Sequence, residues 1–236
     1  MGSNLLMTFQ VQILRTRLMH TISFQRKYVI RELGHWEIEL AKLNLEALRQ
    51  YYVNSEQQLA KELKDFEEKA TNTGVKMPTT DSEEATNDQL ELRHQELTEE
   101  HPQMIRTMAF IAGYRIFESA LRKVYLGEFE RDALTKAPDG KRKYQHALAY
   151  LRLKFPTLFG AVTWARVTDY QKVRDLLMHA DGVVTEMGKP TMVEAAISKC
   201  AGLGVRDGVV SFERPAVEPA IRCMETFLDA LDAEVK

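Results

Sequence analysis

The stretch Val173–Gly182, Val-Arg-Asp-Leu-Leu-Met-His-Ala-Asp-Gly, closes a long helical pattern, and its final glycine is a residue at which helices commonly end. Within it, Arg174 is followed by a polar residue, Asp175, and five positions after the arginine comes His179. A guanidinium group holds phosphate through a planar fork of donors, and an imidazole transfers protons near neutral pH. The stretch therefore predicts a helix end that concentrates reactive side chains.

The spacing of Arg174 and His179 sets a geometric condition on their cooperation. Positions five apart on a straight helix are rotated by about 140°, so the two side chains do not share one stripe. They can act on one phosphate only if the helix distorts here or if a second copy of the chain completes the site.

An arginine, a polar residue and a histidine at this spacing resemble the signature of the HEPN superfamily. The resemblance spans roughly residues 104–234 and includes a strand-like piece and an amphipathic last helix after the motif. It implies an all-α fold, a helical bundle of HEPN type. In that family the motifs of two subunits meet in one composite cleft, which would satisfy the geometric condition.

The resemblance also implies a function. HEPN proteins of this type are metal-independent endoribonucleases that act as toxins, antiviral defence effectors or cleavage domains of CRISPR systems. By resemblance, His179 is the general acid or base, Arg174 stabilises charge on the phosphate, and Asp175 orients one of them. The product would be a 2′,3′-cyclic phosphate, with no metal and no cofactor. One toxin subgroup carries a tyrosine where this chain has Asp181, so control through that tyrosine is not expected.

Periodicity around the motif predicts further helices. They cover 104–129, 141–155, 161–180, 189–201 and 215–235, with Pro156 breaking the second from the third. Apolar residues at Val209, Val210 and Phe212 predict a strand, paired with 203–205 in a minor β-hairpin over 203–213. The range 103–236 is therefore expected to form the HEPN-like helical domain.

The first 102 residues have a different sequence pattern from the rest of the chain. Residues 1–70 predict a long helical extension that either runs on or folds back near Gly34 or Tyr52–Ser55. Apolar residues recur at sevens along it, which fits either an ordinary core stripe or a dimerisation seam: Ile22, Val29, Trp36 and Leu43, with Leu33, Leu40 and Ala47 beside them. Residues 71–102 predict an acidic flexible linker, with a loop over Thr71–Asn87 and a short polar helix over Asp88–Glu100.

Composition limits the compartment and the partners. The net charge is −2, and no apolar run approaches the roughly 18 residues that a membrane span needs. Cys200 and Cys223 lack metal-ligand spacing, and the start of the chain lacks a signal arrangement, so we expect reduced thiols in a cytoplasmic protein without a membrane. Basic residues outnumber acidic ones from Arg115 to Arg174, which favours RNA as a partner. The residues expected to contact RNA are Lys141, Arg142, Lys143 and Lys172.

Two rival functions remain open. Glu32-x-x-His35 and Glu91-x-x-His94 match one unit of di-iron bundles, but such a site also needs two more glutamates on separate helices. A non-catalytic helical bundle that binds RNA or another protein is the stronger alternative. Because no sensing domain is visible, regulation would come from an antitoxin or regulatory protein, the linker or the N-terminal helices. A homodimer is expected from the angular separation of Arg174 and His179 and from the apolar seam on the N-terminal helix.

Overall fold

The computed structural model describes the backbone of residues 3–72, 81–131 and 143–235, and the side chains of 34–71, 88–128 and 144–235. The chain is mostly helical, as the sequence predicted. In chain order the elements are α1 (Ser3–Asn72), α2 (Asp81–Gln95), a π-helical turn (Glu96–Glu100), α3 (His101–Arg131), α4 (Lys143–Lys154), α5 (Pro156–Gly160), α6 (Val162–His179), a 3-10 turn (Val184–Glu186), α7 (Pro190–Ile197), β1 (Leu203–Arg206), β2 (Val209–Phe212) and α8 (Val217–Val235).

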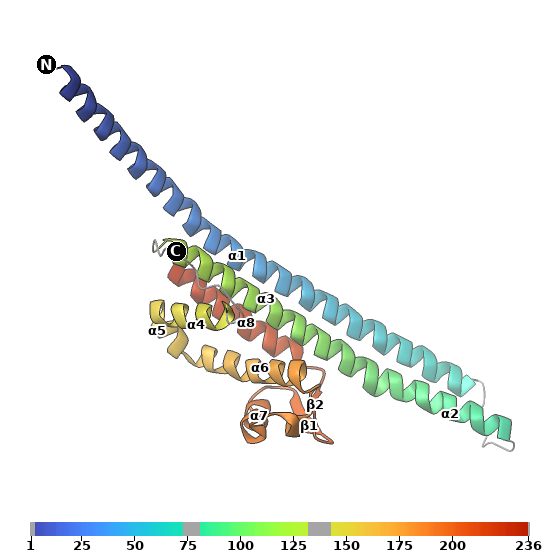
Figure 1. Cartoon of the computed structure of the whole chain (residues 1–236). Coiled ribbons are helices and arrows are strands. Elements are labelled where there is room, and N and C mark those ends of the chain that lie inside the picture. Colours follow the sequence, from blue (N-terminus) through green and yellow to red (C-terminus); the bar gives the residue numbers. More distant parts are fainter. Residues whose placement is uncertain (1–2, 73–80, 132–142, 236) are drawn as a thin grey trace.

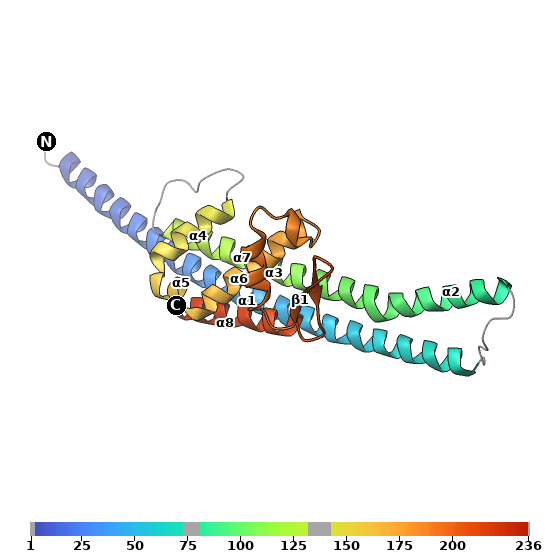
Figure 2. The ribbon, with the colours of Figure 1, turned by 90° about the horizontal axis from the view of Figure 1, so that it is seen from below.

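Helices α1, α3, α6 and α8 build the body. α1 packs against α3 and α8, and α6 packs against the same two helices, so α1 and α6 lie on opposite sides of that pair (Figures 1 and 2). Aromatic rings join the layers: Phe227 of α8 makes edge contacts with Phe117 of α3 and lies against Trp164 of α6. The motif helix is thus anchored by a buried aromatic cluster.

Of the two alternatives for residues 1–70, the structure has the continuous helix, because α1 runs unbroken from Ser3 to Asn72 and does not fold back near Gly34 or Tyr52–Ser55. Gly34 is used for packing: a Cβ there would lie 3.2 Å from Cγ1 of Val235 in α8. The chain reverses after α1, and α2 and α3 run back along it (Figure 1). Beyond the body, the N-terminal half of α1 projects alone (Figure 1).

Part of the predicted linker is helical. The loop expected over Thr71–Asn87 is wrong from Asp81 onward, because α2 begins there and leads through the π-helical turn into α3. Residues 73–80 lie outside the described residues. The sequence did not predict this helix because α2 is polar on all sides and lacks the apolar stripe that indicates an amphipathic helix.

The ranges 1–70 and 103–236, which the sequence predicted as separate parts, share one core. Ile38, Ala41 and Leu45 of α1 belong to the same buried cluster as Tyr114 and Phe117 of α3. The part of α1 that carries Ile38, Ala41 and Leu45 is therefore packed into the body rather than tethered to it. Among the described helices, none carries an apolar stretch of the length that crosses a membrane.

The apolar seam predicted on α1 is not a core stripe. Its described members Trp36 and Leu43 are exposed at 68% and 67%, and Leu40 is exposed at 45%. The face of α1 that enters the core carries Ile38 and Leu45, which follow Trp36 and Leu43 by two positions in the sequence. Helix α1 therefore has two apolar faces, and the one that the sequence singled out faces solvent.

The predicted β-hairpin is confirmed. β1 and β2 pair antiparallel, with Leu203 opposite Phe212 and Arg206 opposite Val209. The turn between them uses left-handed backbone at Asp207 and Gly208, with φ of 52° and 78°. Phe212 is buried against Phe110 of α3, at 5.4 Å between ring centroids, which fixes the hairpin to the bundle.

Candidate functional site

The helix that carries the motif ends at His179, as the sequence predicted within two residues. The amide of Ala180 and that of Gly182 both donate to the carbonyl of Leu176, at 3.0 and 3.3 Å. Asp181 and Gly182 take up left-handed backbone with φ of 46° and 83°. This turn satisfies the last carbonyls of the helix and redirects the chain toward the hairpin.

The hairpin holds this helix end in place. The amide of Val210 in β2 donates to the carbonyl of Gly182 at 2.9 Å, and the amide of Val184 donates to that of Gly208 at the same distance. A Cβ on Gly182 would lie 3.2 Å from Val210, so a glycine is needed both for the backbone angle and for the close packing. The position of His179 is thus set by both α6 and β2.

The Arg174 guanidinium points into the bundle rather than out of it. Its Nη2 forms an ion pair with Glu118 of α3, and its Nη1 donates to Oδ1 of Asp175 at 2.6 Å. Its Cζ lies 5.3 Å from the ring centre of Tyr114, within cation–π range. Both Arg174 and Glu118 side chains are only 17% exposed. Two carboxylates therefore face one guanidinium, and these three side chains together carry a net negative charge.

The sequence did not predict Glu118, Tyr114 or Tyr144 as site residues. Tyr114 and Glu118 are one helical turn apart on α3, so they share the face that receives Arg174. Burial raises the pKa of Tyr144 in α4 to about 12 and that of Tyr114 well above its usual value. Both phenols therefore stay protonated, and the neutral Tyr114 ring lies beside the guanidinium. The four-residue spacing of Tyr114 and Glu118 is the signal that could have paired them.

His179 has a different environment from Arg174. Its side chain is exposed, and within the described part of the chain it forms no hydrogen bond or ion pair. Arg174 turns toward α3, so the structure does not join the two motif side chains through any hydrogen bond between described residues. The expected role of Asp175 fits in one respect, since it holds the guanidinium of Arg174.

The residues expected to contact RNA are only partly described. Lys141 and Arg142 lie outside the described residues, and Lys143 is described only as the first backbone position of α4. Lys172 is half-buried and donates to Asp169 at 2.7 Å. Its charge is therefore partly neutralised inside its own helix.

Other cations of the same region remain open to solvent. Arg115 and Arg122 of α3 and Arg166 of α6 are exposed, and none forms an ion pair with a described residue. Each carries a positive charge on α3 or α6 that no described acidic residue neutralises through an ion pair.

The site combines two groups with useful chemistry. The imidazole of His179 is exposed at the end of α6, and the guanidinium of Arg174 is paired with the carboxylates of Glu118 and Asp175. Nε of Arg174 is buried and has no hydrogen-bond partner among the described residues, so one donor of the fork is not satisfied. Proton transfer and anion binding are within reach of these groups. In comparisons with known proteins, no family model, no curated protein and no solved structure matches this chain.

Proposed function

We propose that this chain is a metal-independent endoribonuclease of HEPN type, acting as a toxin or antiviral defence effector. The observation that carries the proposal is the uncommitted His179 at the end of α6, five positions after Arg174. An exposed imidazole without a hydrogen-bond partner is free to exchange a proton with substrate. The resemblance of the Arg174–Asp175–His179 pattern to the family signature supplies the reaction.

In the proposed reaction, His179 takes the proton from a ribose 2′-hydroxyl or gives one to the leaving 5′-oxygen. The 2′-oxygen attacks the neighbouring phosphorus, the bond to the 5′-oxygen breaks, and a 2′,3′-cyclic phosphate remains. Arg174 stabilises the negative charge that grows on the phosphate oxygens, and Asp175 holds the plane of its guanidinium. DNA lacks the 2′-hydroxyl and would not react.

Glu118 bears directly on this role of Arg174. A phosphate that binds the guanidinium must compete with the Glu118 carboxylate for the same donors. Substrate binding would therefore move Arg174 away from α3, or would use those N–H donors of the guanidinium that do not contact Glu118 or Asp175. The exposed arginines at 115, 122 and 166 favour the approach of a polyanion.

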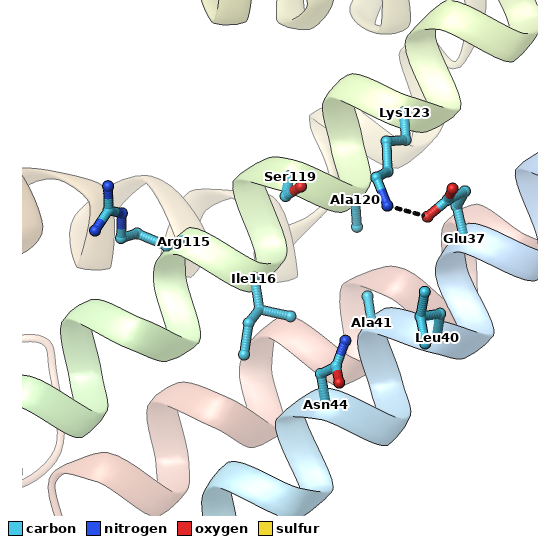
Figure 3. Close-up of a pocket in the computed structure, with 9 residues that line it drawn as sticks. All are labelled: Glu37, Leu40, Ala41, Asn44, Arg115, Ile116, Ser119, Ala120 and Lys123. Atoms are coloured by element: carbon cyan, nitrogen blue, oxygen red, sulfur yellow. Dashed lines mark hydrogen bonds and ion pairs between the residues drawn. The ribbon is translucent and has the colours of Figure 1, made fainter.

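The proposal includes a homodimer with a composite cleft, because Arg174 and His179 point in different directions on α6. The exposed seam on α1 offers apolar surface, and an open groove of about 250 Å³ lies beside it between α1 and α3 (Figure 3). However, α1 and α6 lie on opposite sides of the body (Figure 1). Contact confined to the seam leaves the two motifs apart, so a composite cleft requires the copies to meet through α6.

The test is cleavage of mixed RNA by the purified chain in EDTA, with His179→Ala beside the wild type. Wild type should produce fragments that end in 2′,3′-cyclic phosphate, and His179→Ala should not. Equal cleavage by both proteins would defeat the assignment. Mixing Arg174→Ala with His179→Ala chains tests the composite cleft, because only a shared site regains one intact arginine and one intact histidine.

A second candidate function is a non-catalytic binding module. It is favoured by one observation: Arg174 is already held by Glu118, Asp175 and the Tyr114 ring, as a structural arginine would be. In that case the wild type binds RNA or a protein without cutting RNA. His179→Ala then changes neither property.

A further inference from the structure

Strand β2 is bonded along both of its edges. One edge pairs with β1, and on the other edge the amide of Val210 donates to the carbonyl of Gly182 at 2.9 Å. Main-chain groups two residues apart on a strand point to the same edge, so those of Val210 and Phe212 share this second edge. The end of α6 is therefore attached at one position of the edge, and Phe212 presents its main chain at the next.

A side chain of α3 takes the place of a strand partner at Phe212. The amide of Phe212 donates to Oε1 of Gln103 at 3.0 Å, and Nε2 of Gln103 donates to the carbonyl of Phe212, also at 3.0 Å. A carboxamide can donate and accept at once, which neither a carboxylate nor an ammonium group can do. Gln103 therefore satisfies both main-chain groups of Phe212 with one side chain.

Arg106, one turn further along α3, contacts the same carbonyl. Its Nη1 donates to the Phe212 oxygen at 3.0 Å. Its Nε and Nη2 donate to the two carboxylate oxygens of Glu56 in α1, at 2.7 and 3.0 Å. Glu56 is buried, and a bidentate pair of this kind leaves the guanidinium little freedom to turn. The Phe212 carbonyl thus meets a donor that is itself held in one orientation.

The hairpin has other anchors besides these contacts. The ring of Phe212 is buried against Phe110, and β1 pairs along the other edge of β2. Apolar packing is not directional, whereas hydrogen bonds restrict both distance and angle. Gln103 and Arg106 therefore add a definite position of the β2 edge relative to α3.

We propose that Gln103 and Arg106 are positioning residues for His179, a role that rests on the proposed function. His179 is the last residue of α6, and helix ends fray most readily. The carbonyl of Gly182, three residues later, is bound by β2. By fixing the edge of β2, the two α3 side chains keep the last turn of α6 closed and hold the imidazole in one orientation.

Helix α3 then places both motif residues. Arg174 contacts α3 directly through Glu118, and His179 is connected to it through β2 and Gln103. A displacement of about 1 Å at a reacting group can slow a reaction by about a hundredfold. Gln103 therefore affects the rate of cleavage although it is not one of the reacting groups.

Gln103→Met tests the proposal, because it removes both hydrogen bonds to Phe212 and keeps the length of the side chain. In the folded variant, hydrogen exchange should quicken far more at the amides of Gly182 and Val210 than in the middle of α8. The NMR signals of the His179 imidazole, assigned by their absence in His179→Ala, should shift or broaden. RNA cleavage should lose about tenfold or more in kcat with an unchanged KM.

The matched control is Gln58→Met, because the hydrogen bond of Gln58, to Glu62 at 3.1 Å, stays within α1. It should behave as the wild type in all three measurements. If Gln103→Met does not fold, Gln103→Glu replaces it. This variant keeps the acceptor for the Phe212 amide, so its changes should be smaller and in the same direction.

Wild-type signals of the His179 imidazole in the folded Gln103 variant overturn the proposal. So does wild-type cleavage by a variant in which those signals have moved. Exchange and NMR need no RNA, so a wild type that cuts nothing defeats the proposed function alone. The imidazole signals then still decide whether Gln103 positions His179.

Discussion

Glu118 of α3 forms an ion pair with Arg174 of α6, and the pair joins the motif helix to the middle of the bundle. Glu118→Gln keeps the shape of this side chain and removes its charge. Because Glu118 then competes less with phosphate for the guanidinium, we expect the variant to bind RNA more tightly and to cut it faster. Fluorescence anisotropy with labelled RNA and gel analysis of the products measure the two effects.

The control for this variant is Lys123→Met, which removes an ion pair with Glu37 on the opposite face of α3. It should leave cleavage unchanged. A Glu118→Gln protein as inactive as His179→Ala would mean that Glu118 positions Arg174 for catalysis rather than holding it back.

The two motif residues should differ in their effect on stability. His179 is exposed and has no partner among the described residues, so His179→Ala should change the free energy of unfolding by less than about 0.5 kcal/mol. Arg174→Ala leaves Glu118 half-buried without its partner and removes the packing on Tyr114, so it should cost about 1–3 kcal/mol. Urea unfolding followed by circular dichroism measures both.

This difference decides how activity losses are read. Because Arg174 contacts Glu118, Asp175 and the Tyr114 ring, a loss of activity in Arg174→Ala can come from a loss of stability. Arg174→Lys retains the charge near Glu118 and loses the planar fork, so it is the better activity variant. If Arg174→Ala is as stable as the wild type, the ion pair contributes nothing measurable.

The face through which two copies meet can be located with Leu43. This side chain is 67% exposed on α1, so Leu43→Glu should leave the fold intact. Since a composite cleft needs contact through α6, the variant should remain a dimer in light scattering and should still cut RNA. A shift to the 27.1 kDa mass of one chain would instead place the interface on α1 and would contradict the composite cleft.

The cysteines predict an alkaline limit to stability. Burial raises the pKa of Cys200 to about 12 and that of Cys223 to about 11, from an ordinary 9.0. The folded state therefore keeps both thiols protonated where the unfolded state would lose the protons. The stabilisation is complete below about pH 9 and is lost as pH rises toward 12.

Urea unfolding at a series of pH values should show this decline, and Cys200→Ala should reduce its slope. At pH 8 both thiols should react with iodoacetamide far more slowly in the folded chain than in urea. Rapid labelling of Cys200 in the folded chain would contradict its burial.

The sequence predicted the elements whose signals are local. Pro156 divides two helices because the residue before a proline avoids helical angles, and Val209 to Phe212 carry the residue types of a strand. Gly34 was a candidate for a helix break, because a glycine inside a helix can mark either a break or a close contact. Only the position of Val235 in the folded chain decides between these two roles.

The apolar faces of α1 were ambiguous for a related reason. Trp36 and Ile38 both belong to rows of apolar residues at helical spacing, and the helices that pack against α1 determine which row is buried. The contacts of the candidate site also depend on how the helices pack. The motif was visible in ten consecutive residues, but Glu118 lies 56 positions before Arg174, and no spacing rule connects them.

The unbroken α1 has a consequence for how the molecule moves through water. Seventy helical residues extend about 105 Å, several times the width of a helical bundle. A particle of that length meets more friction than a sphere of equal mass, so it elutes early from a sizing column. A monomer would then be mistaken for a dimer on retention time alone, and sedimentation equilibrium, which is independent of shape, distinguishes the two.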